Sequence, residues 1–298
     1  MTMTIRDVKM SANSQSFNPE QFKAQQRQIW GNAAKGWETW WQTIERGAQK
    51  VSDRLVGMAE IKPGNRVLDI ATGIGEPAVT AAKRVRPNGK VVATDISSQM
   101  IVIAKSRAKS LGLDTIIEFR EGDAEQLDLP KSSFDAILSR WGLMFLPNLP
   151  AALAEIRKLL VPGGRLSAAV WSTPSKVPFL DLAFSTVRKQ INAPPPPPGT
   201  LGPFSLADPE TLKRKFTEAG FKGVQIESFP VTFSFDSAET YTQFQQAVTA
   251  PIQAMLTNQT EEKRKQAWDA ATDAVGKFAD SHGRVSIDNE VTCVVGKS

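Results

Sequence analysis

The sequence has little of what marks secreted, membrane-spanning or metal-binding proteins. Its 298 residues include one cysteine, Cys293, and one histidine, His282. A single cysteine excludes an internal disulfide and a multi-cysteine metal site, and the apolar run around it favours a packed core thiol. No stretch approaches the roughly 18 apolar residues that span a bilayer, and residues 1–16 lack a hydrophobic signal core. We therefore expect a cytoplasmic protein with no membrane span and no metal site.

A block of basic residues is also missing. Thirty-six Lys and Arg residues exceed 31 Asp and Glu residues and give a net charge of +5, but the two signs are interleaved along the chain. Proteins that bind nucleic acids usually gather basic residues into a patch. We expect no nucleic-acid partner. With 41% hydrophobic residues, the chain is long enough for one large domain or for a domain with an insertion.

What the sequence does have is a glycine turn between two apolar runs. The first run ends in Asp69, the bend contains Gly73 and Gly75, and the second run ends in Asp95, 20 residues after Gly75. Glycines let the backbone approach a ligand closely, and the helix that follows presents free N–H groups. An acid at the end of the second strand is placed to accept hydrogen bonds from ribose hydroxyls. This order predicts a site for an adenosine-containing small molecule.

Apolar runs and turn residues predict seven strands. The first five alternate with helices, as in a parallel sheet covered on both faces. A helix at about 179–191 and a stiff proline run at 194–198 precede the sixth strand. The predicted strands lie at about 66–71, 90–95, 115–120, 134–139, 165–171, 224–235 and 284–296.

The glycine loop alone leaves two readings open. Residues 73–78 satisfy the loose dinucleotide pattern G-x-G-x-x-A, so an NAD(P)-dependent oxidoreductase is an alternative. That class does not explain the segment Gly122-Asp123-Ala124 or the turn Pro162-Gly163-Gly164. The sequence also lacks a Tyr-x-x-x-Lys pair, which weighs against the short-chain kind of oxidoreductase.

Four later motifs extend the pattern of the glycine loop. They are Asp95-Ile96-Ser97-Ser98-Gln99-Met100, Gly122-Asp123-Ala124-Glu125, and residues 133–139 and 160–166. The whole series resembles the class I S-adenosylmethionine-dependent methyltransferases, and especially their ubiquinone/menaquinone C-methyltransferase-like branch acting on small molecules. The close match covers residues 60–172. Ala71 departs from the pattern, because it stands where the family's first loop glycine usually is.

The resemblance implies S-adenosyl-L-methionine as cofactor, S-adenosyl-L-homocysteine as product, and in-line methyl transfer to a small, lipophilic or aromatic acceptor by O-, C- or N-methylation. It assigns Asp69 and the backbone of Ala71, Gly73 and Gly75 to the methionine moiety and loop, Asp95 to the ribose hydroxyls, Ile96 and Met100 to the adenine faces, Asp123 and Ala124 to the adenine edge, and Ser139 to the methionine amino end. For Asp69, a buried structural acid is the alternative. Residues 139–142 bear no resemblance to the Asn/Asp-Pro-Pro-aromatic motif of enzymes that methylate nucleic-acid bases. A catalytically silent cofactor-binding relative is a further alternative.

The fold that the resemblance implies is a Rossmann-like α/β sheet of seven strands with the last strand antiparallel. We divide the chain into an N-terminal helical segment (1–60), a cofactor-binding core (61–172), a continuation with the proline-rich loop and sixth strand (173–236), a helical insertion (237–283) and the last strand (284–298). In this topology the insertion emerges at the C-terminal edge of the strands, where ligands bind in open α/β sheets. We expect it to form a lid, with helices capped by Asp236 and Thr260 and a kink near Pro251.

The N-terminal helices, which we expect to begin at Asn18-Pro19-Glu20, carry two tryptophans of interest. Trp30 and Trp37 occupy the place where related enzymes bring an aromatic side chain over the cofactor. A sulfonium cation can rest against such an aromatic face. The alternative is packing within the core, which is the commoner role of aromatic residues at helical spacing.

No catalytic base is evident. His282 is a candidate because it lies just before the last strand, near the ligand edge of the sheet; an exposed turn residue is the alternative. Arg140 is the second candidate, because a residue after the fourth strand is placed to meet an acidic or carbonyl group of the acceptor. A structural ion pair is the alternative for Arg140. Its bulky neighbours Trp141, Met144 and Phe145 favour a flat or lipophilic acceptor.

Overall fold

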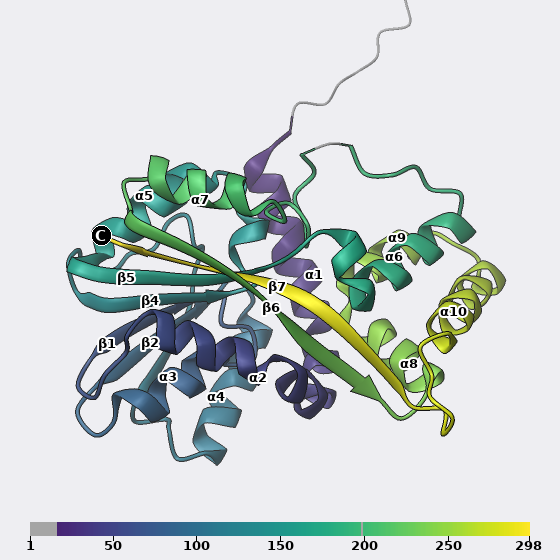
Figure 1. The fold of residues 1–298 in the computed structure, drawn as a ribbon, viewed down its shortest axis with the longest axis horizontal. Helices are drawn as coiled ribbons and strands as arrows, with labels where there is room; N and C mark the ends of the chain where they lie inside the picture. Colours follow the sequence, from purple (N-terminus) through teal and green to yellow (C-terminus); the bar gives the residue numbers. More distant parts are fainter. Residues whose placement is uncertain (1–16, 198) are drawn as a thin grey trace, which may run out of the picture.

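The computed structural model of the chain describes residues 17–197 and 199–298, and shows one sheet with helices around it (Figure 1). The expectation of a missing signal core concerns residues 1–16 and lies outside the described residues, as does the last proline of the run at 194–198. Among the described helices, none combines the length and apolar character needed to cross a bilayer.

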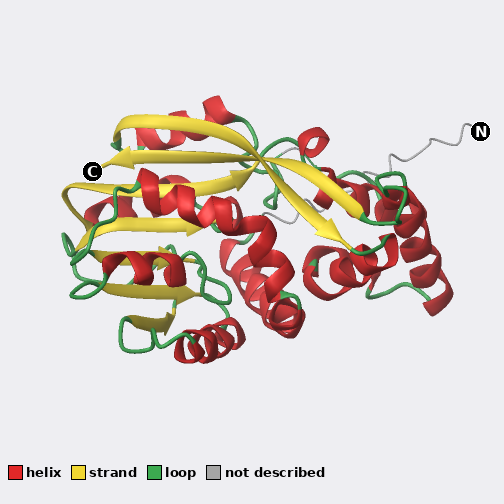
Figure 2. Cartoon of the chain, turned by 60° about the horizontal axis from the view of Figure 1, so that its bottom comes forward, coloured by secondary structure: helices red, strands yellow, loops and turns green. Residues whose placement is uncertain are grey.

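The sheet has the strand order β3-β2-β1-β4-β5-β7-β6. Strands β1 to β5 pair in parallel, and β7 lies antiparallel between β5 and β6. This topology confirms the predicted fold class (Figure 2). The strands are β1 (Arg66–Ile70), β2 (Lys90–Asp95), β3 (Ile117–Glu121), β4 (Phe134–Arg140), β5 (Leu160–Trp171), β6 (Lys222–Phe235) and β7 (Val285–Lys297).

Helices cover both faces of the sheet. On one face, α2 (Trp41–Met58), α3 (Ala78–Val85) and α4 (Ser98–Ser110) pack against the strands, and α5 (Leu149–Leu159) and α7 (Pro209–Glu218) pack together on the other (Figures 1 and 2). Because both faces are covered, the central strands are apolar and buried; Val67 and Leu68 on β1 have no exposed surface. Cys293 on β7 is also buried, and burial raises the pKa of its thiol to about 12. The prediction of a core thiol is therefore confirmed.

The N-terminal helix α1 (Pro19–Thr39) runs across the C-terminal edge of the parallel strands, and begins as predicted: the Asn18 side chain accepts a hydrogen bond from the Gln21 N–H, and Pro19 occupies the first turn. It contacts α4 on one side and the inserted helices α8 (Ala238–Val248) and α9 (Ala250–Leu256) on the other. Gly36 allows α1 to approach α8 closely, because a Cβ atom there would lie 2.0 Å from the Ala247 carbonyl oxygen.

The insertion between β6 and β7 consists of α8, α9 and α10 (Glu261–Gly276), and α6 (Pro178–Gln190) packs against it. Two short 3-10 helices, Leu143–Phe145 and Pro174–Lys176, follow β4 and β5. Thr260 caps α10 as predicted, but the cap of α8 is Ser237 and not Asp236, because the Ser237 hydroxyl accepts the Thr240 N–H. Pro251 does not kink one long helix. It lies in the first turn of the separate helix α9, where its missing N–H costs nothing.

The close approach at Gly36 predicts that Gly36→Ala is strongly destabilising. The added methyl group would collide with backbone, which cannot move aside as a side chain can, so we expect a loss of roughly 1–3 kcal/mol in the free energy of unfolding. Gly57→Ala on α2 is the matched control, because nothing lies within 4 Å of a Cβ there. The free energy of unfolding of the control should rise by up to about 1 kcal/mol. Denaturant unfolding measures both, and equal effects would contradict the prediction.

Candidate functional site

One cavity lies at the C-terminal ends of the parallel strands. The loops after β1, β2, β3 and β4 form its floor, and α1 and the inserted helices form much of its wall. Helices α8 and α9 and the residue between them contribute Phe244, Val248, Thr249 and Pro251. Of the residues that the sequence assigned to a site, the lining includes Trp30, Trp37, Ala71, Gly73, Asp95, Ile96, Met100, Asp123, Ala124 and Arg140.

The loop after β1 has the backbone conformation that its glycines allow. Gly73 and Gly75 have positive φ angles of 56° and 107°, and Ala71 also has a positive φ of 58°. The left-handed conformation explains why glycine suits position 71, and an alanine held there carries roughly 1–2 kcal/mol of strain. Gly75 does not line the cavity, since a Cβ there would instead meet Ala104 on α4 at 3.5 Å.

Asp69 lies beneath this loop and not in the cavity lining. Its side chain is fully buried, and one carboxylate oxygen accepts hydrogen bonds from the Thr72 hydroxyl at 2.6 Å and the Ala78 N–H at 2.9 Å. Burial raises the pKa of Asp69 to about 8, although the hydrogen bond from Thr72, the charge of Arg140 and the Ala78 N–H act in the opposite direction. The contacts match the structural alternative, in which Asp69 fixes the loop and the start of α3.

Asp95 lines the cavity and also fixes the loop. Its two carboxylate oxygens accept the Gly73 N–H at 2.8 Å and the Ser97 N–H at 2.9 Å. Burial raises the pKa of Asp95 to about 6, against the effect of these backbone donors. The carboxylate therefore joins the end of β2 to the glycine loop while keeping its remaining acceptor capacity on the cavity side.

The loop after β3 brings Asp123 and Ala124 to the same cavity, next to Ile96 and Met100 from the loop and helix after β2. Met100 is 2% exposed and packs with Ile74, which closes that end of the floor. Sequence reasoning missed the partner of Asp123, which is Lys23 on α1 at 2.8 Å.

Arg140 and Glu76 form a buried polar group at the other end of the cavity. Arg140 is 8% exposed and donates a hydrogen bond to the Ser52 hydroxyl at 2.8 Å. Burial lowers the pKa of Arg140, and the charges of Glu76, Asp69 and Glu45 counter that effect. Glu76, which sequence reasoning also missed, is 4% exposed and accepts a hydrogen bond from Thr80 at 2.7 Å. Its position directly after Gly75, in the glycine loop, was the feature of the sequence that could have identified Glu76 as a site residue.

Aromatic side chains form a further part of the cavity wall. Trp141 has a positive φ of 63° and stacks on Trp171 with ring centroids 4.3 Å apart. Phe179 and Phe233 stack in the same way at 4.2 Å, and Phe244 lies against Phe179. All five side chains line the cavity, so the wall is flat and apolar.

The two N-terminal tryptophans stand on the α1 side. Trp30 meets Phe145 edge to face with centroids 5.4 Å apart, and lies 6.1 Å from Trp37. The Trp37 indole N–H donates to the Val248 carbonyl oxygen at 3.2 Å, which links α1 to α8. Both rings therefore pack against their neighbours and face the cavity.

Besides Asp69 and Gly75, two further residues assigned from the sequence, Ser139 and His282, do not line the cavity. Ser139 is fully buried, and its hydroxyl has no partner among the described residues. His282 is exposed in the turn before β7, where its backbone N–H donates to Asp280 at 2.8 Å, and it is absent from the cavity lining. This matches the alternative of an exposed turn residue.

Comparisons with known proteins agree with this geometry. A family described as "Methyltransferase domain" matches residues 67–164. A demethylmenaquinone methyltransferase from Symbiobacterium thermophilum is 26% identical over 71% of this chain and 90% of its own length. The ubiquinone/menaquinone biosynthesis C-methyltransferase UbiE of Pseudomonas putida is 31% identical over 53% of this chain, and this match spans only 62% of that protein.

A solved structure shares the fold. Phosphoethanolamine N-methyltransferase 2 of Haemonchus contortus, crystallised with S-adenosylhomocysteine, superposes with a TM-score of 0.54 and 17% sequence identity. The superposition covers 95% of this chain and 60% of that one.

The buried acid Asp69 predicts a pH dependence of stability. Between about pH 4 and pH 8 the folded protein holds a proton on Asp69 that the unfolded chain releases, so the free energy of unfolding falls as the pH rises through this window. Asparagine cannot titrate, and Asp69→Asn should therefore flatten the slope. Denaturant unfolding at about pH 5 and pH 8 measures it. Asp114 is exposed, and Asp114→Asn serves as the control that should keep the wild-type dependence of the free energy of unfolding on pH. The same wild-type dependence in Asp69→Asn would contradict the prediction.

Proposed function

Because the chain belongs to the class I S-adenosylmethionine-dependent methyltransferases, we propose that it transfers the methyl group of this cofactor to a small, flat, lipophilic acceptor. One observation carries the proposal. The buried carboxylate of Asp95 accepts the Gly73 N–H in a cavity that stacked aromatic side chains also line. A ribose-binding acid and an apolar acceptor wall thus share one enclosed space.

The cofactor side of the cavity fits an adenosyl group. Asp95 would accept hydrogen bonds from the ribose hydroxyls, Ile96 and Met100 would flank the adenine ring, and Asp123 with Ala124 would meet its edge; all five residues line the cavity. The open space around Gly73 leaves room for the methionine chain, because a Cβ there would meet nothing within 4 Å. We assign Asp69 and Gly75 to the support of the loop, and none of Asp69, Gly75 and Ser139 to direct contact with the cofactor.

Arg140 and Glu76 take over the polar contacts at the methionine end. A buried guanidinium that lines a cavity is suited to a carboxylate or carbonyl oxygen, and a buried carboxylate is suited to an ammonium group. A zwitterionic amino-acid end offers both partners. Arg140 also lies over the Trp141 ring, with 5.2 Å from the guanidinium carbon to the ring centroid, and so stands between the cofactor end and the acceptor wall.

The acceptor side favours an aromatic or quinone-type ring. The stacked pairs Trp141–Trp171 and Phe179–Phe233 present flat faces, and Phe244 covers them from the insertion. The two relatives compared above are named for methyl transfer in menaquinone and ubiquinone biosynthesis, and a ring of that kind suits this wall. The alternative of an NAD(P)-dependent oxidoreductase is not favoured, because methyltransferases match the whole segment that carries the glycine loop.

In the mechanism, the residues of the chain supply alignment and exclusion of water. When bound, S-adenosylmethionine would supply an electrophilic methyl group on its sulfonium; the acceptor atom would bond to this carbon as the carbon–sulfur bond breaks, with S-adenosylhomocysteine as the leaving group. Trp30 and Trp37 place aromatic faces on the α1 side of the cavity, where contact with a cation is worth roughly 0.5–2 kcal/mol. The described lining offers the carboxylates of Glu76, Asp95 and Asp123 but no histidine, so we assign His282 no role.

Titration calorimetry tests the cofactor assignment. We expect the protein to bind S-adenosylmethionine and S-adenosylhomocysteine but not NADH or NADPH. Asp95→Ala should weaken both affinities at least about tenfold, because hydrogen bonds to a charged group contribute roughly 1.5–3 kcal/mol. Asp114→Ala, an exposed acid, is the control. Binding of a nicotinamide cofactor alone would overturn the proposal.

The raised pKa of Asp95 predicts weaker cofactor binding in acid. Below about pH 6 the carboxyl group is protonated and loses acceptor capacity for the ribose hydroxyls. The dissociation constant for S-adenosylhomocysteine should therefore rise about tenfold for each pH unit below 6. Asp95→Asn should bind weakly at every pH with a flat profile over the same range. A wild-type affinity that stays constant down to about pH 4.5 would argue against ribose binding by this carboxylate.

A further inference from the structure

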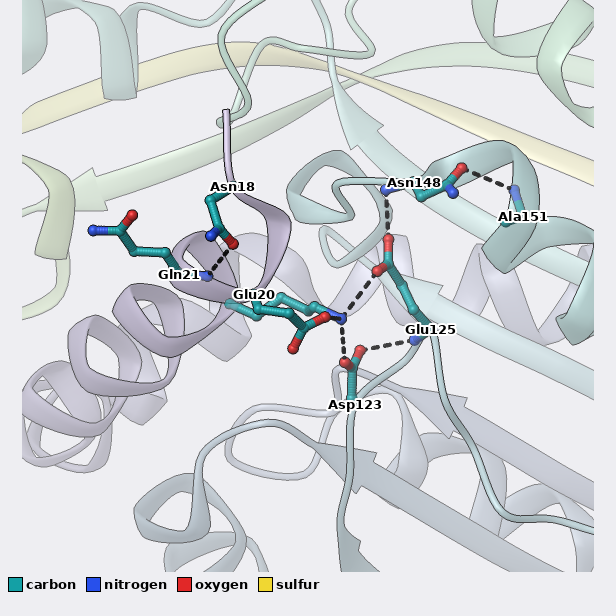
Figure 3. Close-up of polar contacts among 8 residues, drawn as sticks. Asn18, Glu20, Gln21, Asp123, Glu125, Asn148 and Ala151 are labelled. Atoms are coloured by element: carbon teal, nitrogen blue, oxygen red, sulfur yellow. Dashed lines mark hydrogen bonds and ion pairs between the residues drawn. The ribbon is translucent and has the colours of Figure 1, made fainter. Parts of the chain in front are cut away.

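Lys23 is a buried cation on an otherwise polar part of α1. Its side chain is 7% exposed, and its ammonium group lies 2.7 Å from Glu20, 2.8 Å from Asp123 and 3.3 Å from Glu125. Figure 3 shows these three carboxylates, from two separate segments, converging on one point. Burial lowers the pKa of Lys23, but the hydrogen bonds to the three acids raise it above its ordinary value. Lys23 is therefore fully charged near neutral pH.

The same contacts tie α1 to two further elements. The Asp123 carboxylate accepts the Glu125 backbone N–H at 2.9 Å, which fixes the loop after β3. Glu125 accepts the Asn148 N–H at 2.5 Å, and the Asn148 side chain caps α5 through the Ala151 N–H (Figure 3). One lysine thus connects the N-terminal helix, the β3 loop and the start of α5.

This connection lies at the adenine end of the cavity. Lys23 and Asp123 both line it, and the same helix contributes Gln26, Trp30 and Trp37 to the wall. Helix α1 is therefore one side of the enclosure. Apart from Lys23, the one other ion pair between α1 and the β3 strand or its loop in the described chain is Arg27–Glu121, which is exposed and 3.9 Å long.

The Lys23 contacts are also suited to repeated opening. Glu20 is 74% exposed and Asp123 lines the cavity, so the Lys23 ammonium group and these two carboxylates can regain water when α1 moves away. A deeply buried pair would instead leave uncompensated charges, at a cost of several kcal/mol. The intact ion pairs of Lys23 keep α1 in place, and their partly hydrated carboxylates keep the cost of separating them low.

We propose that Lys23 is a clasp that holds α1 over the adenine end of the bound cofactor and releases at each exchange of cofactor and product. The inference rests on the proposed placement of the adenine edge at Asp123 and Ala124. Lys23 positions a wall of the site and neutralises the carboxylate that meets the adenine edge; it does not touch the reacting atoms.

The dissociation rate of S-adenosylhomocysteine tests the clasp. Tritiated S-adenosylhomocysteine is bound to the full-length protein and chased with unlabelled ligand in rapid filtration. Lys23→Met keeps the alkyl chain but removes the charge, and should speed dissociation at least about tenfold, which corresponds to 1.4 kcal/mol. Lys23→Arg should restore a rate within about threefold of the wild type. Lys35→Met, on the same helix but 84% exposed, should leave the rate unchanged.

Amide hydrogen exchange of residues 19–29 separates a clasp from a merely structural ion pair. Bound S-adenosylhomocysteine should protect this segment in the wild type and not in Lys23→Met. A wild-type dissociation rate in Lys23→Met, or faster dissociation with unchanged protection, would overturn the inference.

A second variant covers the case in which Lys23→Met does not fold. Glu125→Gln removes the charge of one carboxylate that contacts Lys23 from the loop after β3. It should speed dissociation of S-adenosylhomocysteine about threefold, and an unchanged rate in this variant would overturn the clasp. The assay contains no acceptor, so a failure to methylate a chosen acceptor does not affect it. If S-adenosylhomocysteine does not bind at all, the proposed function and the clasp both fail.

Discussion

The hydrogen bond from the Gly73 N–H to the Asp95 carboxylate organises the site. It joins the loop after β1 to the end of β2 across a donor–acceptor distance of 2.8 Å. The bond requires Gly73 to adopt a positive φ, and the Asp95 carboxylate in turn accepts the Ser97 N–H at the start of α4. Because burial opposes the charge on Asp95, these backbone donors are what keep a carboxylate stable at the floor of an apolar cavity.

Much of the sheet could be predicted from the sequence, because each strand is a buried apolar run between turn residues. The ends of β1, β2 and β4 lie within one residue of the prediction. Strand β5 begins at Leu160 instead of 165, because Leu160 pairs with Phe134 before the turn at Gly163 and Gly164 interrupts the register. A turn signal inside a strand looks like a strand boundary when only the sequence is read.

The site was less predictable, since its important contacts join residues far apart in the chain. Asp69 and Asp95 end similar apolar runs, yet one lies beneath the loop and the other faces the cavity. Lys23 reads as a solvated position on a helix, and only the fold brings Asp123, 100 residues away, to its ammonium group. Glu76 also lines the cavity, and the periodicity of the sequence around it does not show this. Periodicity reports which side of its own element a residue occupies, but not what another element places opposite it.

The contact of α1 with α8 at Gly36 has a consequence for the transfer of the insertion from one protein to another. The two helices come from opposite ends of the chain, and at this point they touch through backbone without an intervening side chain. A chimera that receives a foreign insertion between β6 and β7 would therefore lose the surface that α1 fits. A graft that keeps this contact needs both segments from the same donor protein.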